Sequence, residues 1–398
     1  MKRTLRLLLL RLAGWLLRHS IPTATTVVGD NLQILIVRPD QLGDVLLSRP
    51  AIEALSRAIP GAQITVAVGP WGRPALGQEQ KKVIICPFPG FGDPLSWVQP
   101  YILLLYYARL LRRINRFSMV VVLRPDHWWS ALLGCLAGIP LRVGYSTPET
   151  EPFLTVALPH DANCHAVTEA NRLAEAAAKC GGGRIDHNER DLYNLPTSAT
   201  PEDERRVADL LCRYGVADHV RLLVLHPGSN SRLKSWPLAQ FAVVGAQLSA
   251  QLGMQVIVTG SLRERTQAEQ LCRLLSQESL NLAGLLSWGG LEALLARASL
   301  VIGVDSGPLH LAVATGTPSV ALFGPADPVQ FAPWGSSSRH RVVHADLQCR
   351  PCRRLDYCRI EPAGSDPPPC MRAISTTTVQ EAALRAMQEG RRTPVAIH

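Results

Sequence analysis

The sequence predicts an α/β protein of two successive Rossmann-like domains that face a central cleft, and three observations carry this prediction. Short apolar runs alternate with helical segments, which is typical of a parallel sheet covered on both faces. A polar stretch interrupts this alternation near the middle of the chain, and the alternation then starts again. The chain also has 398 residues, too many for one hydrophobic core, since domains usually hold about 100–200 residues.

The first half supplies three predicted strands and three predicted helices. Apolar runs predict strands at residues 33–37, 64–68 and 119–123. Helices are expected at residues 44–59, 130–137 and 165–180, the first ended by Pro60-Gly61 and the third by Gly181-Gly182-Gly183. We therefore expect an N-terminal domain over residues 31–190.

The second half repeats the pattern after a predicted linker. Residues 186–203 are rich in Asn, Pro, Ser and Thr, which is typical of a connecting segment. Beyond it, strands are expected at residues 222–225, 255–259 and 299–304 and within Pro318–Pro325, and helices at 238–252, at 263–275 and from about Pro308. We expect a C-terminal domain over residues 204–385, with a cysteine-rich insertion at 345–372.

Composition narrows the class of protein. A hydrophobic content of 47% with 18% charged residues is ordinary for a globular enzyme. The formal net charge of +9 favours anionic partners such as nucleotides, phosphorylated sugars or acidic lipid. Aromatic residues make up only 6%, and no basic run is interleaved with them, so a nucleic-acid binder is disfavoured. The ten cysteines include no disulfide framework of a small secreted domain, which favours a reducing cytoplasm.

Residues 1–30 form a separate N-terminal extension. Its leucine-rich part is interrupted by arginines and is too short for a spanning helix, which needs about 20 mostly apolar residues. Wound as a helix, it places Arg3, Arg6, Arg11 and Arg18 within an arc of roughly 140°, with Leu5, Leu8, Leu12 and Leu16 on the opposite side. This favours a basic amphipathic helix on an anionic membrane surface, and a helix docked on the protein itself is the alternative.

Polar residues follow the strand predicted at 299–304. Asp305, Ser306 and Gly307 come directly after it, and His310 follows one turn into the next helix. In open α/β sheets ligands bind at the carboxyl ends of strands, where helix N-termini offer free N–H groups to anions. The pattern predicts a pocket for a phosphorylated, hydroxyl-rich ligand, although a simple capped turn would also contain Ser and Asp.

The first strand is also followed by a candidate site. Gly43 would let the backbone approach a ligand closely, and Asp44 lies in the first turn of the predicted helix. The helix dipole stabilises a carboxylate there, so Asp44 is a candidate ionised base for a sugar hydroxyl. A plain helix cap is the alternative.

Two further strand ends carry ligand-type residues. Gly228 and Ser229 could offer N–H and O–H groups to a phosphate, with Lys234 as a point charge. Glu264 follows the next strand, where a carboxylate could hold ribose hydroxyls. Four consecutive strand ends of this kind favour a ligand-binding enzyme.

These motifs, in this order, resemble glycosyltransferase family 9, the lipopolysaccharide heptosyltransferase group. The resemblance covers residues 32–385 and rests on four motifs in the printed sequence: Arg38-x-Asp40-x-Leu42-Gly43-Asp44, Pro227-Gly228-Ser229 with Lys234-x-Trp236-Pro237, Gly260-x3-Glu264, and Asp305-Ser306-Gly307-Pro308-x-His310-x-Ala312. It implies a GT-B fold and an inverting, metal-independent transfer of a sugar, most often heptose from ADP-heptose, to a lipid-linked or cell-envelope glycan acceptor. It also implies a peripheral protein at the inner face of the cytoplasmic membrane.

The resemblance also implies roles for individual residues. Asp44 would be the general base, Lys234 would neutralise the diphosphate, and Glu264 would hold the nucleoside. The pocket for the diphosphate and sugar would be lined by Asp305, Ser306, Gly307 and His310. No Asp-x-Asp motif for a divalent metal accompanies them, and a departing diphosphate needs positive charge in any case.

Four cysteines near the C-terminus raise a separate question. Cys349, Cys352, Cys358 and Cys370 lie within 22 residues, and a Cys-x2-Cys pair with two further thiols has the spacing of a structural zinc site. An iron–sulfur cluster, two disulfides or free thiols are the alternatives. A catalytic metal is not expected, because Pro367-Pro368-Pro369 indicates a peripheral loop.

Competing functions are weaker. The sequence has no Gly-x-Ser-x-Gly elbow, no Gly-x-Gly-x-x-Gly after a strand and no P-loop. A noncatalytic, membrane-associated nucleotide-sugar-binding protein of the same fold is the main alternative. A zinc-bearing nucleic-acid binder is suggested only by the charge and the cysteines.

Overall fold

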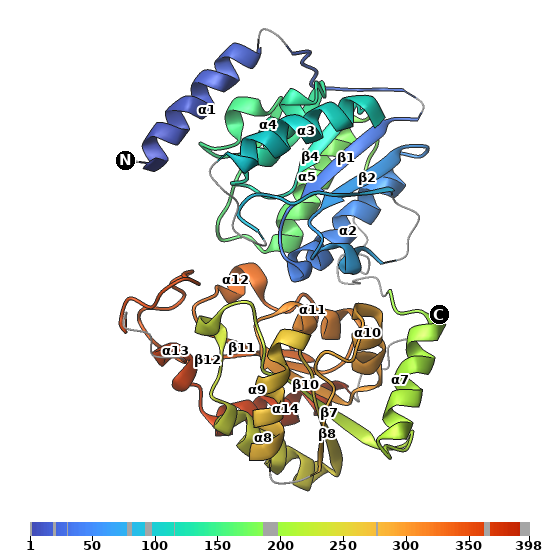
Figure 1. The fold of residues 1–398 in the computed structure, drawn as a ribbon, viewed down its shortest axis with the longest axis vertical. Helices are drawn as coiled ribbons and strands as arrows, with labels where there is room; N and C mark the ends of the chain where they lie inside the picture. Colours follow the sequence, from blue (N-terminus) through green and yellow to red (C-terminus); the bar gives the residue numbers. More distant parts are fainter. Residues whose placement is uncertain are drawn as a thin grey trace. The chain divides into compact units, whose positions relative to one another are not determined.

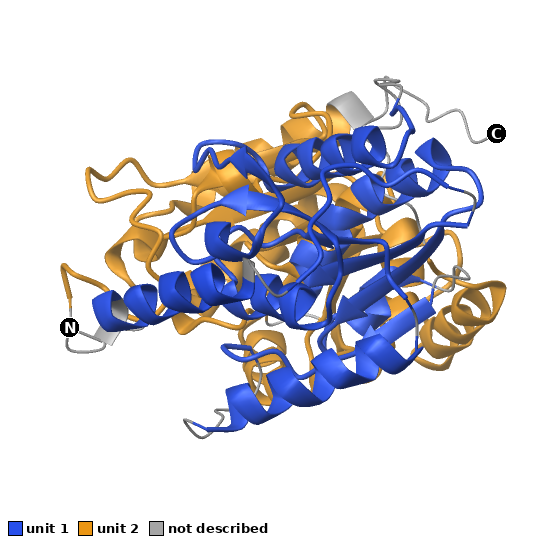
Figure 2. Ribbon diagram, turned by 90° about the horizontal axis from the view of Figure 1, so that it is seen from above, with its two compact units in different colours: residues 1–192 blue, residues 193–398 orange. Residues whose placement is uncertain are grey.

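The computed structural model describes residues 2–18, 21–29, 31–77, 82–91, 98–114, 116–185, 198–275, 278–361 and 367–390. The chain divides into two compact units, residues 1–192 (unit 1) and 193–398 (unit 2), which are distinguished by colour in Figure 2. Each unit is built around its own parallel sheet and is described by itself.

Unit 1 contains a six-stranded parallel sheet in the order β3-β2-β1-β4-β5-β6. Its strands are β1 (Gln33–Arg38), β2 (Gln63–Val68), β3 (Lys82–Ile85), β4 (Met119–Val122), β5 (Leu141–Ser146) and β6 (Val156–Pro159). In register, Ile36 lies opposite Val66 on one side and Val121 on the other. The central strands are buried on both faces, so they form near-continuous apolar runs in the sequence.

Helices cover both faces of this sheet (Figure 1). On one face α2 (Leu42–Ala58) packs against α5 (Ala166–Cys180). On the other, α3 (Gln99–Ile114) and α4 (Trp128–Leu136) share a hydrophobic core with strands β1 and β4. The turns η1 (Arg73–Leu76) and η2 (Glu151–Phe153) complete the unit. The contact of α2 with the end of α5 requires Gly183, since a Cβ there would lie 2.1 Å from the carbonyl oxygen of Ala58.

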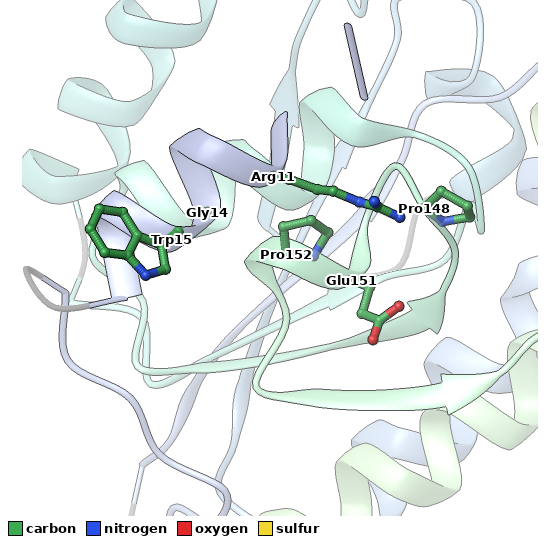
Figure 3. A pocket seen from close by; sticks show the side chains of 6 residues that line it. All are labelled: Arg11, Gly14, Trp15, Pro148, Glu151 and Pro152. Atoms are coloured by element: carbon green, nitrogen blue, oxygen red, sulfur yellow. The ribbon is translucent and has the colours of Figure 1, made fainter. Parts of the chain in front are cut away.

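The N-terminal extension forms helix α1 (Lys2–Arg18), which docks on unit 1 over η2. Leu10 reaches the hydrophobic core, and Gly14 lies so close to Pro152 that a Cβ would come within 2.5 Å of the proline Cβ. A shallow hollow of about 260 Å³ lies beside this contact, and Figure 3 shows Arg11 extending across it toward Pro148. One side of α1 therefore docks on the protein itself, which was the alternative prediction for this helix.

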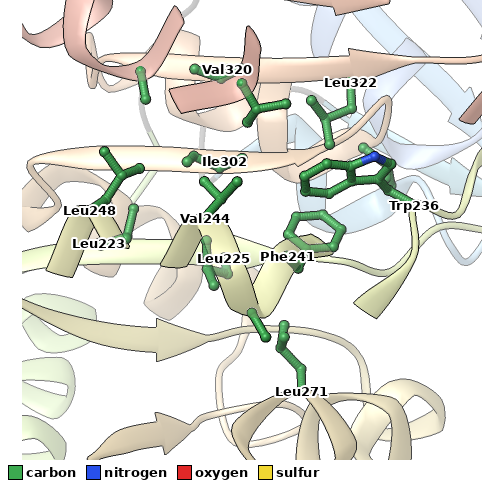
Figure 4. Close-up of a cluster of buried hydrophobic side chains, with 14 of the residues drawn as sticks. Leu223, Leu225, Trp236, Phe241, Val244, Leu248, Leu271, Ile302, Val320 and Leu322 are labelled. Carbon is green, nitrogen blue, oxygen red and sulfur yellow. The ribbon is translucent and has the colours of Figure 1, made fainter. Parts of the chain in front are cut away.

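Unit 2 contains a second six-stranded parallel sheet in the order β12-β11-β10-β7-β8-β9. Its strands are β7 (Arg221–His226), β8 (Met254–Val258), β9 (Ser279–Asn281), β10 (Leu300–Val304), β11 (Ser319–Phe323) and β12 (His340–His344). One hydrophobic core joins β7, β10 and β11 to helices α8 (Leu238–Leu252) and α14 (Thr376–Gly390) (Figure 4). Trp236 and Phe241 are fully buried there, with ring centroids 4.8 Å apart.

The remaining described helices of unit 2 lie between or after the strands. They are α7 (Pro201–Arg213), α9 (Arg265–Leu274), α10 (Trp288–Arg297), α11 (Gly307–Ala314), α12 (Pro328–Phe331) and α13 (Pro369–Arg372), with the short turns η3 (Arg232–Lys234) and η4 (Leu262–Glu264). None of the helices in the described part of the chain is both long and apolar enough to span a bilayer.

The predicted α/β class is confirmed, and every predicted strand is present. The predicted linker at residues 186–203 is wrong at its end, because α7 begins at Pro201; residues 186–197 lie outside the described residues. Thr200 and Asp203 form a capping box, with Pro201 in the first turn of α7. Thr and Pro are common in loops, but here they begin a helix. The domain boundaries predicted from the sequence stay predictions.

The buried aromatic pair of unit 2 leads to a stability prediction. Replacing Phe241 with Ala should lower the free energy of unfolding by about 3–5 kcal/mol, because it leaves a cavity beside Trp236. Val243→Ala, at an exposed position on the same helix, is the matched control and should cost less than about 1 kcal/mol. Chemical denaturation of both variants measures the difference, and equal losses would contradict the assignment of this core.

Candidate active site

The carboxyl end of β1 carries a buried ion pair beside Asp44. Arg38 is the last residue of β1, and its Nε lies 3.1 Å from a carboxylate oxygen of Asp40. Both side chains are buried. The same guanidinium donates to the carbonyl of Leu123 (3.1 Å) and lies 3.7 Å from the carboxylate of Asp44. Arg38 therefore joins the ends of β1 and β4 to the first turn of α2.

Arg124 extends this network from the end of β4. It bonds to the second carboxylate oxygen of Asp40 and, at 2.8 Å, to Asp126. Burial alone would raise the pKa of Asp40, but the charges of Arg38 and Arg124 outweigh it and lower that pKa. Asp40 is thus ionised at neutral pH and fixes two arginines at this edge of the sheet.

Asp44 is more accessible than Asp40. It lies in the first turn of α2 with Gly43, and its side chain is 27% exposed, whereas that of Asp40 is 4% exposed. Because Asp44 lies in the first turn of α2, its carboxylate is near the positive end of the helix dipole. The N-cap residue, Gln41, makes no side-chain cap bond. Asp44 can reach a ligand, while Asp40 is confined to a structural ion pair.

Aromatic rings lie next to this charged group. The indole of Trp71 donates to the carbonyl oxygen of Asp40 (2.8 Å), and its ring centroid lies 6.1 Å from that of Phe91. The guanidinium of Arg124 lies 5.2 Å from the centroid of Phe91. His127 contacts the same ring, and burial lowers its pKa to about 4, so it is neutral here. Aromatic rings and the cation of Arg124 therefore lie together beside the Arg38–Asp40 pair.

A second titratable group lies at the ends of β5 and β6. Glu169, in α5, lies 3.0 Å from the imidazole of His160, and its backbone carbonyl accepts a bond from the hydroxyl of Tyr145. Burial raises the pKa of Glu169 to about 7 and lowers that of His160. Both shifts favour the uncharged forms of the two side chains.

In unit 2 the structure brings together Lys234 and Asp305, which lie 71 residues apart in the sequence. The ammonium of Lys234 lies 2.6 Å from the carboxylate of Asp305 and 3.4 Å from its carbonyl oxygen. The side chains are 14% and 6% exposed. An ammonium has three donors, so this arrangement leaves one for a ligand.

The helix that follows β10 begins beside this pair. Ser306 is the N-cap of α11 but makes no side-chain cap bond, because its hydroxyl donates instead to the carbonyl of Val304 (2.9 Å). Gly307 opens the helix with its first N–H, and His310 is buried one turn further on. Pro308 has no N–H and the N–H of Leu309 donates to the carbonyl of Ser306, so this N-terminus offers an anion its positive potential and the N–H of Gly307.

Glu264 is fixed by its own turn and by a glycine opposite. Its carboxylate accepts a bond from the backbone N–H of Ser261 (2.6 Å) in a capping box. A Cβ on Gly228 would lie 2.2 Å from the other carboxylate oxygen of Glu264, so a larger residue there would displace this carboxylate. The structure therefore joins two sites that the sequence analysis treated separately.

Ser229 is placed differently from the other candidates. Its hydroxyl donates to the carbonyl of Ser231 (2.7 Å) and accepts from the N–H of the same residue (3.1 Å). In this conformation it shapes the loop between β7 and η3. A phosphate contact by this hydroxyl stays a prediction.

The cysteine cluster gains no support as a metal site. All four sulfurs are free thiols, with Cys349 and Cys352 exposed and Cys370 buried. Burial, and then the neighbouring thiols, raise the pKa of Cys370 to about 11. Within the described residues, no three His, Cys, Asp or Glu side chains stand where they could hold a metal ion. The zinc prediction therefore stays a prediction.

Arg124, Trp71 and Glu169 were not identified as site residues from the sequence. A signal existed for Arg124, since Arg124-Pro125-Asp126 directly follows the strand predicted at residues 119–123. Trp71 lies in a loop rich in Pro and Gly, and Glu169 lies inside an Ala-rich helix. Their proximity to the site depends on the order of strands in the sheet.

Comparisons with known proteins identify the family of this chain. The family model described as "Glycosyltransferase family 9 (heptosyltransferase)" matches residues 107–361. Lipopolysaccharide heptosyltransferase 2 of Salmonella typhimurium is 27% identical over 318 residues, covering 78% of this chain and 88% of that protein.

Two solved structures share the fold. A family 9 glycosyltransferase from Veillonella parvula aligns with a TM-score of 0.71 and 20% identity, covering 92% of this chain and 100% of that one. The Escherichia coli ADP-heptose lipopolysaccharide heptosyltransferase II aligns with a TM-score of 0.67 and 22% identity, covering 91% and 100%.

The fold and the matches define a glycosyltransferase of the GT-B fold, and the chain is an enzyme of that class. It belongs to glycosyltransferase family 9, the heptosyltransferase family.

The buried pair at β1 predicts a specific loss of stability. Replacing Asp40 with Asn leaves Arg38 buried without its carboxylate and should cost about 3–5 kcal/mol. Asp126→Asn is the control, because this carboxylate also pairs with Arg124 but is 61% exposed, so its loss should cost less than about 1 kcal/mol. Denaturant titration of unfolding at neutral pH compares the two.

The same pair has a defined pH dependence. A lowered folded-state pKa means that Asp40 stabilises the fold above its ordinary value of 3.8 and loses this effect as the pH falls through the folded value. The stability difference between the native protein and Asp40→Asn should hold from neutral pH down to about pH 4 and shrink below it. A difference that shrinks already between pH 7 and 5 would contradict this assignment.

Proposed function

We propose that this enzyme transfers a heptose from ADP-heptose, with inversion at the anomeric carbon, to a lipopolysaccharide-core or other cell-envelope glycan acceptor. The observation that carries the proposal is the junction of Lys234, Asp305 and the uncapped N-terminus of α11. This junction offers a cation, the positive end of a helix dipole and the N–H of Gly307 at one place, as a departing diphosphate requires. The likeness to proteins named for lipopolysaccharide heptosyl transfer and for ADP-heptose supports the choice of donor and acceptor.

In the proposed reaction Asp44 acts as the general base. Its carboxylate takes the proton of an acceptor hydroxyl, whose oxygen attacks the anomeric carbon of the donor sugar. The bond from that carbon to the diphosphate oxygen breaks, and the electron pair leaves with the nucleoside diphosphate. Attack from the face opposite the leaving group gives inversion. Arg38, whose guanidinium lies 3.7 Å from the carboxylate of Asp44, orients that carboxylate.

Donor binding is assigned to unit 2. Lys234 donates its remaining N–H to the diphosphate, and Ser306 and Gly307 present the helix N-terminus to the same group. Glu264 holds nucleoside hydroxyls from the loop after β8, with Gly228 leaving room for its carboxylate. His310 and Asp305 line the pocket behind the sugar. The acceptor is assigned to the charged and aromatic residues of unit 1.

We also propose that the enzyme acts as a peripheral protein at the inner face of the cytoplasmic membrane. Helix α1 carries basic residues and no acidic one, which suits an anionic lipid surface. A lipid-linked acceptor would be available at such a surface.

Replacing Asp44 with Ala should lower turnover by about 10²-fold or more, the usual scale for a general base, while ADP affinity changes little. Glu53→Gln, a carboxylate further along α2, is the matched control and should retain turnover. Release of ADP from ADP-heptose in the presence of acceptor measures both. Unchanged turnover in Asp44→Ala would remove this residue from the mechanism.

Replacing Lys234 with Ala should weaken ADP binding by about tenfold or more, because a charge-assisted contact to the diphosphate is lost. AMP, which lacks the second phosphate, should lose less affinity. Calorimetric titration of both nucleotides separates this effect from a general disturbance by the unpaired Asp305. Equal losses for ADP and AMP would contradict the diphosphate role.

The predicted structural metal at Cys349, Cys352, Cys358 and Cys370 requires elemental analysis of the purified protein. Bound zinc that disappears in a Cys349→Ser, Cys352→Ser variant would support it. Iron in place of zinc would change the metal, and absence of both from protein prepared without chelators would reject the site.

A further inference from the structure

Helix α1 leaves a continuous apolar side in solvent. Six of its large side chains are 55–62% exposed. They are Leu5, Leu8, Leu9, Leu12, Trp15 and Leu16. The side that docks on unit 1 is a different one, formed by Leu10, Ala13, Gly14 and Leu17. Docking therefore does not explain the exposed side, and an apolar patch of this extent indicates a binding surface.

Helix α3 repeats this arrangement. Leu104, Ala108 and Leu111 are buried, whereas four large apolar or aromatic side chains on the other side are 47–60% exposed: Tyr101, Ile102, Leu105 and Tyr106. A shallow hollow of about 400 Å³ runs along this exposed side and continues past Arg109 and Arg113. Tyrosines and arginines beside leucine and isoleucine are typical of a helix at the boundary between lipid and water.

The two exposed sides face away from the same face of the sheet. Leu10 of α1 and the buried residues of α3 enter one hydrophobic core, together with α4 and one face of the β1–β4 pair (Figure 1). Since both helices turn their buried sides to this core, their exposed sides point outward from it. Both apolar strips therefore belong to helices on the same side of the sheet of unit 1.

The charge on these helices indicates which partner covers their exposed apolar sides. Helices α1 and α3 contain eight basic residues and no acidic one: Lys2, Arg3, Arg6, Arg11, Arg18, Arg109, Arg112 and Arg113. A second copy of the chain bound through this side would bring like charges together. An anionic bilayer surface offers negative head groups to the arginines and acyl chains to the leucines.

We propose that α3 is a second lipid-contacting element, which acts with α1 to lay this side of unit 1 on an anionic bilayer. Two contacts fix the orientation of unit 1 on the surface, whereas one helix alone would leave it free to rotate. The benefit for a lipid-linked acceptor rests on the proposed function, but lipid binding itself does not.

Vesicle flotation tests the proposal with the full chain. Vesicles of phosphatidylcholine containing about one-third phosphatidylglycerol should bind the protein, and pure phosphatidylcholine should bind it much less. Two double variants should each weaken binding about tenfold or more: Ile102→Ser with Tyr106→Ser in α3, and Leu8→Ser with Leu12→Ser in α1. Arg109→Gln, Arg113→Gln should weaken it about fivefold per arginine, and this loss should vanish at high salt.

Val243→Ser, Leu274→Ser is the matched control, because it removes two exposed apolar side chains from helices of unit 2. ADP binding, helical content and melting temperature should be unchanged in all variants, which separates lipid binding from folding and from the proposed transfer reaction. Trp15 adds a direct readout, since brominated lipid should quench its fluorescence and Trp15→Phe should lose that part of the quenching.

Two results would overturn the proposal. Native-like vesicle binding by the α3 variant would leave α1 as the sole contact. Self-association of the native protein that the same variants abolish, without vesicle binding, would make a second copy the occupant. Failure of ADP-heptose turnover with intact vesicle binding would instead reject the proposed function and leave this surface in place.

Discussion

In each unit an ion pair with little exposure to solvent lies at the carboxyl end of the sheet. In unit 1 Arg38 pairs with Asp40, and in unit 2 Lys234 pairs with Asp305. A buried charge is costly unless an opposite charge and hydrogen bonds compensate it. These pairs therefore constrain the loops that follow the strands and hold the more accessible groups, Asp44 and the start of α11, in place.

The two pairs serve different chemistry. In unit 1 the guanidinium of Arg38 lies 3.7 Å from the carboxylate of Asp44, the proposed proton acceptor. In unit 2 the lysine keeps an unused donor next to an uncapped helix N-terminus, which favours an anion. Proton acceptance and anion stabilisation are the two requirements of sugar transfer from a nucleoside diphosphate, and in the proposed reaction unit 1 would provide the first and unit 2 the second.

Much of the fold could be predicted from the sequence, because the central strands are buried on both faces and read as apolar runs. Helix α3 was not predicted, although Arg109, Arg112 and Arg113 recur at helical spacing along it. The proximity of Lys234 to Asp305 and of Glu264 to Gly228 also escaped the sequence. Such contacts depend on which strands are neighbours, here β7 with β8 and β10, and local patterns do not specify that order.

Calorimetric titration of the purified protein with ADP, UDP, GDP, TDP and CMP, followed by ADP-heptose, tests the central claim most directly. Selective binding of ADP, with ADP-heptose also bound, is the result expected of this enzyme. Preference for another nucleoside diphosphate would keep the fold and the proposed chemistry but overturn the donor. Binding of no nucleotide would contradict the assignment of Lys234, Glu264 and the α11 N-terminus to a nucleotide-sugar site.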